Sequence, residues 1–130
     1  MKLLGVDYGS KRVGLALADT AEGVCLPWKV LEGLQDEALA EKLAQIISEE
    51  KIETLVFGEP LQLSGERGPA ALRVHTFIKD LSKHIGEIPI HLVDERFSSA
   101  YADHFTKESG MPRDAVAAAA ILETYLEGRK

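Results

Sequence analysis

Acidic side chains at three places in this 130-residue chain have the residue type and the spacing to do chemistry together. Asp7 closes an apolar run, Asp94-Glu95-Arg96 follows a second apolar run, and Asp114 lies in the first turn of a predicted helix. Because sites in open α/β sheets form beyond the carboxyl ends of the strands, we expect these acids to converge there. Carboxylate oxygens suit hard cations, so the pattern predicts a Mg²⁺ or Mn²⁺ site and phosphodiester hydrolysis.

Each of these acids also has a purely structural interpretation. Asp7 could be a turn aspartate, Asp114 could stabilise a helix N-terminus, and Asp94-Glu95-Arg96 could be a solvated charge run. Side chains alternate along a strand, so only one of Asp94 and Glu95 can point toward Asp7. The metal hypothesis depends on the three places being taken together, because converging carboxylates repel one another unless a cation neutralises them.

Basic side chains lie on the side where the acids should meet. They are Lys11, Arg12, Arg67, Arg96 and Arg113, each at a predicted strand end, in a loop or near a helix start. The net charge of −6 argues against a nonspecific nucleic-acid coat protein, but residues 32–53 alone carry seven acids and two bases. At most five phosphate contacts predict a shallow salt dependence of nucleic-acid binding, with a slope of roughly −3 to −4.

Size and composition bound the remaining possibilities. A length of 130 residues predicts one domain over residues 1–130. Cys25 is the single cysteine, which excludes an internal disulfide, and the four histidines have no metal-ligand spacing. No apolar stretch approaches the roughly 20 residues that span a bilayer, and no signal-like run precedes the first strand. We therefore expect a cytoplasmic protein with no membrane partner.

The order of predicted elements is that of an α/β fold with a mixed sheet. An antiparallel hairpin forms one edge, βαβ crossovers follow it, and strand 54–58 runs parallel to the first strand. Pro27 places the third strand near an edge. The predicted strands cover residues 2–7, 13–18, 25–31, 54–58 and 90–94, and the predicted helices cover 36–50, 69–85, 98–108 and 112–126.

Four motifs resemble one known family over nearly the whole chain. They are Gly5-Val6-Asp7-Tyr8-Gly9-Ser10-Lys11-Arg12-Val13-Gly14-Leu15-Ala16, then Phe57-Gly58-Glu59-Pro60 with Gly65, then Asp94-Glu95-Arg96-Phe97-Ser98-Ser99, and Asp114-Ala115-Val116-Ala117-Ala118. In this order they are similar to the YqgF (RuvX) family of the RNase H-like superfamily. The resemblance implies an RNase H-like mixed sheet with helices on both faces. It also implies that Asp7, Glu95 and Asp114 form a catalytic metal site, and that Lys11, Arg12 and Arg96 contact phosphates.

The resemblance further implies a metal-dependent nuclease that acts in 5′-end maturation of precursor 16S rRNA, with precursor rRNA and a ribosomal particle as partners. The family was first described as a Holliday-junction resolvase, which makes branched DNA the alternative substrate. A nucleic-acid-binding module without catalysis is a second alternative. Actin-like and sugar-kinase ATPases share the Asp-x-Gly opening, but they bind nucleotide between two such domains, and this length accommodates one.

Overall fold

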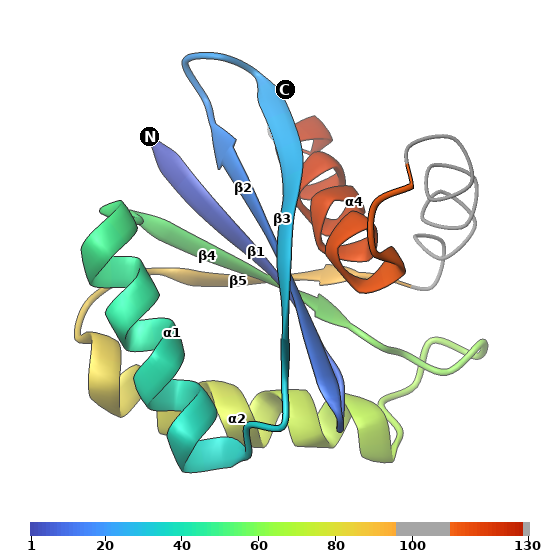
Figure 1. The fold of residues 1–130 in the computed structure, drawn as a ribbon. Helices are drawn as coiled ribbons and strands as arrows, with labels where there is room; N and C mark the ends of the chain where they lie inside the picture. Colours follow the sequence, from blue (N-terminus) through green and yellow to red (C-terminus); the bar gives the residue numbers. More distant parts are fainter. Residues whose placement is uncertain (96–109, 129–130) are drawn as a thin grey trace.

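The computed structural model describes residues 1–95 and 110–128, which form a five-stranded mixed sheet flanked by helices on both faces (Figure 1). The strands are β1 (Lys2–Tyr8), β2 (Arg12–Asp19), β3 (Val24–Glu32), β4 (Thr54–Glu59) and β5 (Ile90–Asp94). The helices are α1 (Asp36–Glu50), α2 (Pro69–Ile85) and α4 (Arg113–Glu127). The predicted α/β class and mixed sheet are confirmed.

The strand order is β3-β2-β1-β4-β5. β1 pairs with β2, and β2 with β3, in antiparallel fashion, whereas β4 is parallel to both β1 and β5. β3, which contains Pro27, lies at the sheet edge as predicted. The last helix begins at Arg113, one residue later than predicted, with Pro112 as its N-cap. The predicted helix 98–108 lies outside the described residues.

Helices α1 and α2 cover one face of the sheet. Side chains of β1 and β4 alternate, so Leu4, Val6 and Phe57 point to this face and pack against Leu43 and Phe77. All five side chains are at most 2% exposed. Of the acidic residues at positions 32–53, Asp36 and Glu37 lie in the first turn of α1, where a negative charge is favourable near the helix N-terminus.

Helix α4 covers the opposite face at unusually close range. A Cβ atom at Gly5 would lie 2.7 Å from the backbone oxygen of Ala118, and one at Gly14 would overlap the backbone oxygen of Asp114. The run of alanines on α4 and the glycines below it thus allow backbone to approach backbone. Among the described residues, no helix is long and apolar enough to cross a membrane.

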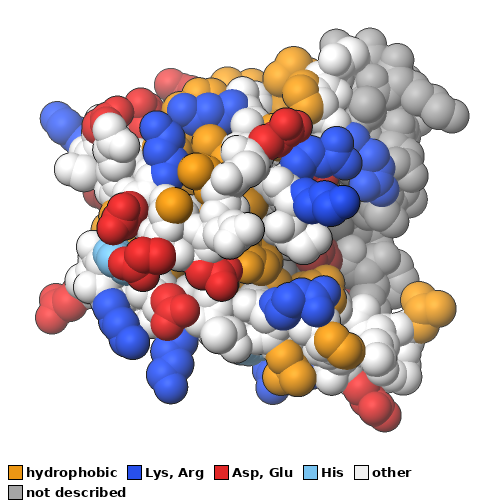
Figure 2. Space-filling view, turned by 60° about the horizontal axis from the view of Figure 1, so that its bottom comes forward, with side chains coloured by type: hydrophobic (Ala, Val, Ile, Leu, Met, Phe, Trp, Pro, Cys, Tyr) orange, Lys and Arg blue, Asp and Glu red, His pale blue; other side chains and the backbone are white. Residues whose placement is uncertain are grey.

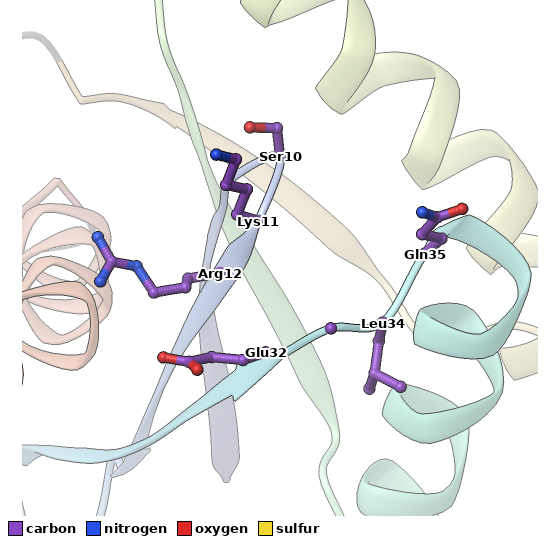
Figure 3. A pocket seen from close by; sticks show the side chains of 7 residues that line it. Ser10, Lys11, Arg12, Glu32, Leu34 and Gln35 are labelled. Carbon is purple, nitrogen blue, oxygen red and sulfur yellow. The ribbon is translucent and has the colours of Figure 1, made fainter.

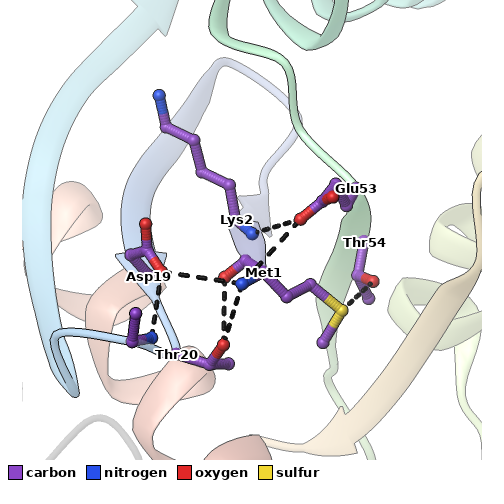
Figure 4. Close-up of polar contacts among 7 residues, drawn as sticks. Met1, Lys2, Asp19, Thr20, Glu53 and Thr54 are labelled. Atoms are coloured by element: carbon purple, nitrogen blue, oxygen red, sulfur yellow. Dashed lines mark hydrogen bonds and ion pairs between the residues drawn. The ribbon is translucent and has the colours of Figure 1, made fainter.

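The start of β1 is fixed by polar contacts at the end of the sheet away from Asp7 (Figure 4). The amide of Lys2 donates to Glu53 Oε2 at 2.8 Å, and the amide of Glu53 donates to the carbonyl of Lys2 at 2.9 Å. The amino group of Met1 donates to Thr20 Oγ1 at 2.9 Å. These contacts tie β1 to its neighbours on both sides and so fix the position of its far end.

The close approach of α4 generates a prediction for Gly14→Ala. The added methyl group would collide with the backbone of Asp114, so we expect the free energy of unfolding to fall by about 2–3 kcal/mol in chemical denaturation. Gly128→Ala is the control, because its Cβ would meet nothing closer than 3.6 Å. Equal stability of the two variants would show that α4 does not rest on β2 at Gly14.

Candidate active site

Asp7 lies on the α4 face near the end of β1, between two glycines. Gly14 is its partner in β2, and Gly58 is the next residue of β4 beyond the pair formed by Val6 and Phe57. A Cβ atom at Gly58 would lie 2.8 Å from Glu95 Oε2. The missing side chains on both neighbouring strands leave the space in which Glu95 and the first turn of α4 reach the end of β1.

Glu95, and not Asp94, is the acid that meets Asp7. The two carboxyl groups share a hydrogen bond. Burial, followed by the charge of Asp7, raises the pKa of Glu95 to about 8. Burial also raises the pKa of Asp7, although the hydrogen bond from Glu95 acts in the opposite direction. At neutral pH this pair therefore holds a proton between its two carboxyl groups, with Glu95 as the donor.

Asp114 is close to Asp7 and Glu95, but its carboxylate forms an ion pair with Arg12. Its charge contributes to the raised pKa of Asp7, whereas the charge of Arg113 lowers it. Asp114 Oδ2 lies 3.2 Å from the Nε of Arg12, which opens β2. Within residues 1–95 and 110–128, no three Asp, Glu, His or Cys side chains are arranged so that they could hold a metal ion together. The predicted convergence is thus found for Asp7 and Glu95, with Asp114 held beside them by Arg12.

The predicted phosphate contacts gather around the same end of the sheet. Lys11 and Arg12 line a hollow of about 610 Å³ between the β1–β2 turn and the start of α1 (Figure 3). Arg12 extends from there toward α4, where it lines a second hollow of about 300 Å³ with Arg113. Figure 2 shows basic side chains clustered beside the grey atoms, with most of the visible acidic side chains in the other half of the view. Arg96 lies outside the described residues.

Arg67, the remaining predicted phosphate contact, is bound to an acid that the sequence analysis gave no role. Its Nε lies 2.7 Å from Glu59 Oε2, and His75 Nε2 lies 2.5 Å from the same oxygen. Burial raises the pKa of Glu59, but the hydrogen bonds from His75 and Arg67 and their charges outweigh it, so the pKa lies below its usual value. Glu59 is therefore an ionised carboxylate, although only 9% of the residue is exposed.

Two sequence signals could have found these additional residues. Glu59 follows a largely apolar run at the end of β4, as Asp7 does one residue before the end of β1, and the same argument applies to both. Gly14 and Gly58 lie inside buried strands, where a glycine often marks the close approach of another group. The pairing of Glu59 with His75 had no such signal, because the two residues are 16 positions apart and their contact depends on how α2 packs.

The pKa values of the acidic pair predict how stability depends on pH. Below pH 4 Glu95 is protonated in both the folded and the unfolded chain; between about pH 4.5 and pH 8 only the folded chain keeps this proton. The free energy of unfolding must then fall as pH rises through that range. In the absence of metal, we expect Glu95→Gln to gain roughly 3–4 kcal/mol relative to the parent between pH 4 and pH 8. Denaturation at several pH values measures this difference, and a constant difference would show that Glu95 titrates normally.

Comparison with known proteins places this geometry in a family. The family model described as RuvX, Holliday junction resolvase, matches residues 1–128. A "Putative pre-16S rRNA nuclease" from Maridesulfovibrio salexigens is 41% identical, with 97% of this chain and 98% of the relative covered. A protein of the same name from Rickettsia akari is 33% identical, with 98% and 87% covered.

A solved structure shares the fold. RuvC from Thermus thermophilus, in complex with a Holliday junction substrate, aligns with a TM-score of 0.65 at 14% identity, covering 93% of this chain and 89% of RuvC. This similarity confirms the RNase H-like mixed sheet. The match of the family model over residues 1–128 and the identity with full-length relatives show that the chain belongs to the RuvX family.

Proposed function

We propose that this protein is a metal-dependent nuclease that hydrolyses phosphodiester bonds in the 5′-end maturation of precursor 16S rRNA. The observation that carries the proposal is the contact of the half-buried Asp7 and Glu95 at the strand ends of a RuvX-family chain. A contact between two partly buried carboxyl groups is electrostatically unfavourable when both are ionised, and it is typical of sites that bind a cation or move protons. The names of the relatives support rRNA as the substrate, which would place the activity in the cytoplasm.

The residues at this site fit a hard divalent cation, Mg²⁺ or Mn²⁺. The available donors are carboxylate oxygens, which such ions prefer, and the shared proton marks excess negative charge that a cation would neutralise. Asp7 and Glu95 would hold the ion, and Asp114 would join them when Arg12 releases it. A bound ion would supply positive charge that stabilises the scissile phosphate.

The basic residues bind and orient the substrate in this proposal. Lys11, at the β1–β2 turn, has no carboxylate of the described residues within ion-pair distance, so its ammonium group can contact a phosphate directly. Arg12 lies between Asp114 and the hollow beside Lys11, so a substrate phosphate can compete with Asp114 for its guanidinium group. Arg113 and Arg96 flank the carboxylates along the chain, and Arg67 lies on the other side of the sheet.

Holliday-junction resolution is the second candidate function. The family description and the shared fold with RuvC, which was solved with a junction, favour it. Phosphodiester hydrolysis on branched DNA would use the same carboxylates. A resolvase must cut two strands symmetrically, and a symmetric dimer is the usual way to place two sites. The two candidates therefore differ in the substrate that is cut and in the oligomeric state during cutting.

A cleavage assay tests the proposal. With Mn²⁺ or Mg²⁺, we expect the parent protein to cut a precursor 16S rRNA 5′ segment faster than single-stranded RNA of unrelated sequence or a four-way DNA junction. Asp7→Asn should lower the rate at least about 100-fold, because even indirect partners of a metal cost 10- to 100-fold. Preferential cutting of the junction by a dimer would favour the resolvase, and no cutting of any substrate would leave only the binding module.

Salt dependence tests the placement of the nucleic acid. Lys11→Ala should weaken RNA binding for all sequences and reduce the slope of log affinity against log salt by about 0.7–0.9, the value for one lost phosphate contact. Lys79→Ala removes the same charge from an exposed position on α2 and should leave the slope unchanged. Equal effects of the two substitutions would mean that the β1–β2 turn does not face the nucleic acid.

A further inference from the structure

The strand ends carry a second polar cluster on the α2 face, opposite the acidic pair. Glu59 is the last residue of β4, and its Oε2 contacts both Arg67 Nε and His75 Nε2, at 2.7 Å and 2.5 Å. The side chain of Glu59 is only 12% exposed, whereas that of Arg67 is 59% exposed. The cluster therefore has a buried, immobilised acid at its centre and a largely accessible guanidinium group at its rim.

Glu59 is also hydrogen-bonded to the segment that contains Glu95. The carbonyl oxygen of Glu59 accepts hydrogen bonds from the amide of Glu95 at 3.2 Å and from the amide of Leu61 at 2.9 Å. One residue thus joins three parts of the molecule: the loop after β4, helix α2 through His75, and the end of β5. A displacement of Glu59 would therefore alter the positions of both Arg67 and Glu95.

Arg67 is held in a way that leaves its outer nitrogens for a ligand. Among the described residues, its ion pair is formed through Nε and not through the two terminal nitrogens, and 59% of the side chain is exposed. A guanidinium group fixed by one carboxylate keeps a planar pair of donors that matches a phosphate. An arginine without such a carboxylate partner would lose its rotamer freedom only on binding, and this entropic cost would weaken its affinity for the phosphate.

We propose that Glu59 is a positioning residue: with His75 it fixes Arg67 so that the guanidinium group binds a substrate phosphate next to the scissile one, and its carbonyl holds the segment of Glu95. This inference rests on the proposed nuclease function. Asp7 and Glu95 lie on the α4 face and Glu59 on the α2 face of the same sheet edge. A bound strand would therefore cross that edge, with consecutive phosphates on its two sides.

A purely electrostatic role of Glu59 and a positioning role predict opposite changes in RNA affinity when the charge of Glu59 is removed. If Glu59 only neutralised Arg67, removing its charge would strengthen the attraction of Arg67 for RNA. If Glu59 positions Arg67, removing its charge would weaken RNA binding, because the guanidinium group loses its fixed orientation. The sign of the change in affinity separates the two interpretations.

The experiment measures the affinity of full-length protein for a precursor 16S rRNA 5′ segment at several salt concentrations, with EDTA present to prevent cleavage. We expect Glu59→Gln to weaken binding about 3- to 10-fold and to reduce the salt slope by about 0.7–0.9. Glu66→Gln, the control, removes the same charge from an exposed position in the same loop and should change affinity less than about twofold. In an Arg67→Ala background, Glu59→Gln should have no further effect on affinity.

Arg67→Lys is the second variant, and it keeps the charge while removing the planar donor pair. It should lose affinity as Glu59→Gln does, and it tests the inference even if Glu59→Gln does not fold. Tighter or unchanged binding by Glu59→Gln, equal loss in the Arg67→Ala background, or parental binding by Arg67→Lys would each overturn the inference. If one of these contradicting results is obtained with a parent protein that cuts RNA, the proposed nuclease function is retained and only the inference about Glu59 fails. If the parent neither binds nor cuts nucleic acid, both fail.

Discussion

The contact between the carboxyl groups of Asp7 and Glu95 is the interaction on which the rest of this structure depends. Two half-buried acids repel when both are ionised, so other parts of the fold must hold them together. It does so with covalent and steric constraints: Asp7 is fixed by a β1 strand that pairs on both sides, and Glu95 follows β5 directly and lies over Gly58. The alanines of α4 serve the same purpose, because they bring Asp114 down onto Gly14 and next to the pair.

The two faces of one sheet edge carry acids in opposite electrostatic environments. The α4 face holds Asp7 and Glu95, whose carboxyl groups share a hydrogen bond and both have raised pKa values. The α2 face holds Glu59, an acid whose pKa is lowered and which contacts Arg67 and His75. Glu59 ends β4 and Glu95 follows β5, yet burial raises the pKa of Glu95, whereas the hydrogen bonds and charges of Arg67 and His75 lower the pKa of Glu59. The neighbours of each carboxyl group therefore decide the direction in which its pKa is shifted.

The sequence allowed much of this arrangement to be predicted because strand ends and chain order are local properties. Apolar runs located the strands that carry the acids, and the position of Pro27 located an edge. The partner of each charge was not local: Arg12 was expected to face phosphate, and it contacts Asp114 because α4 packs closely on β2. Glu59 stayed without a role for the same reason, since its partners come from a loop and a helix that only packing brings together.

The central claim is that Asp7 and Glu95 share a proton that a divalent cation displaces, and proton release on metal binding measures it most directly. Calorimetric titration with Mn²⁺ at pH 7, in buffers of different ionisation enthalpy, counts the protons released for each ion bound. The raised pKa of Glu95, about 8, predicts close to one proton for the parent and none for Glu95→Gln. Mn²⁺ binding without proton release by the parent, or equal release by both proteins, would contradict the account.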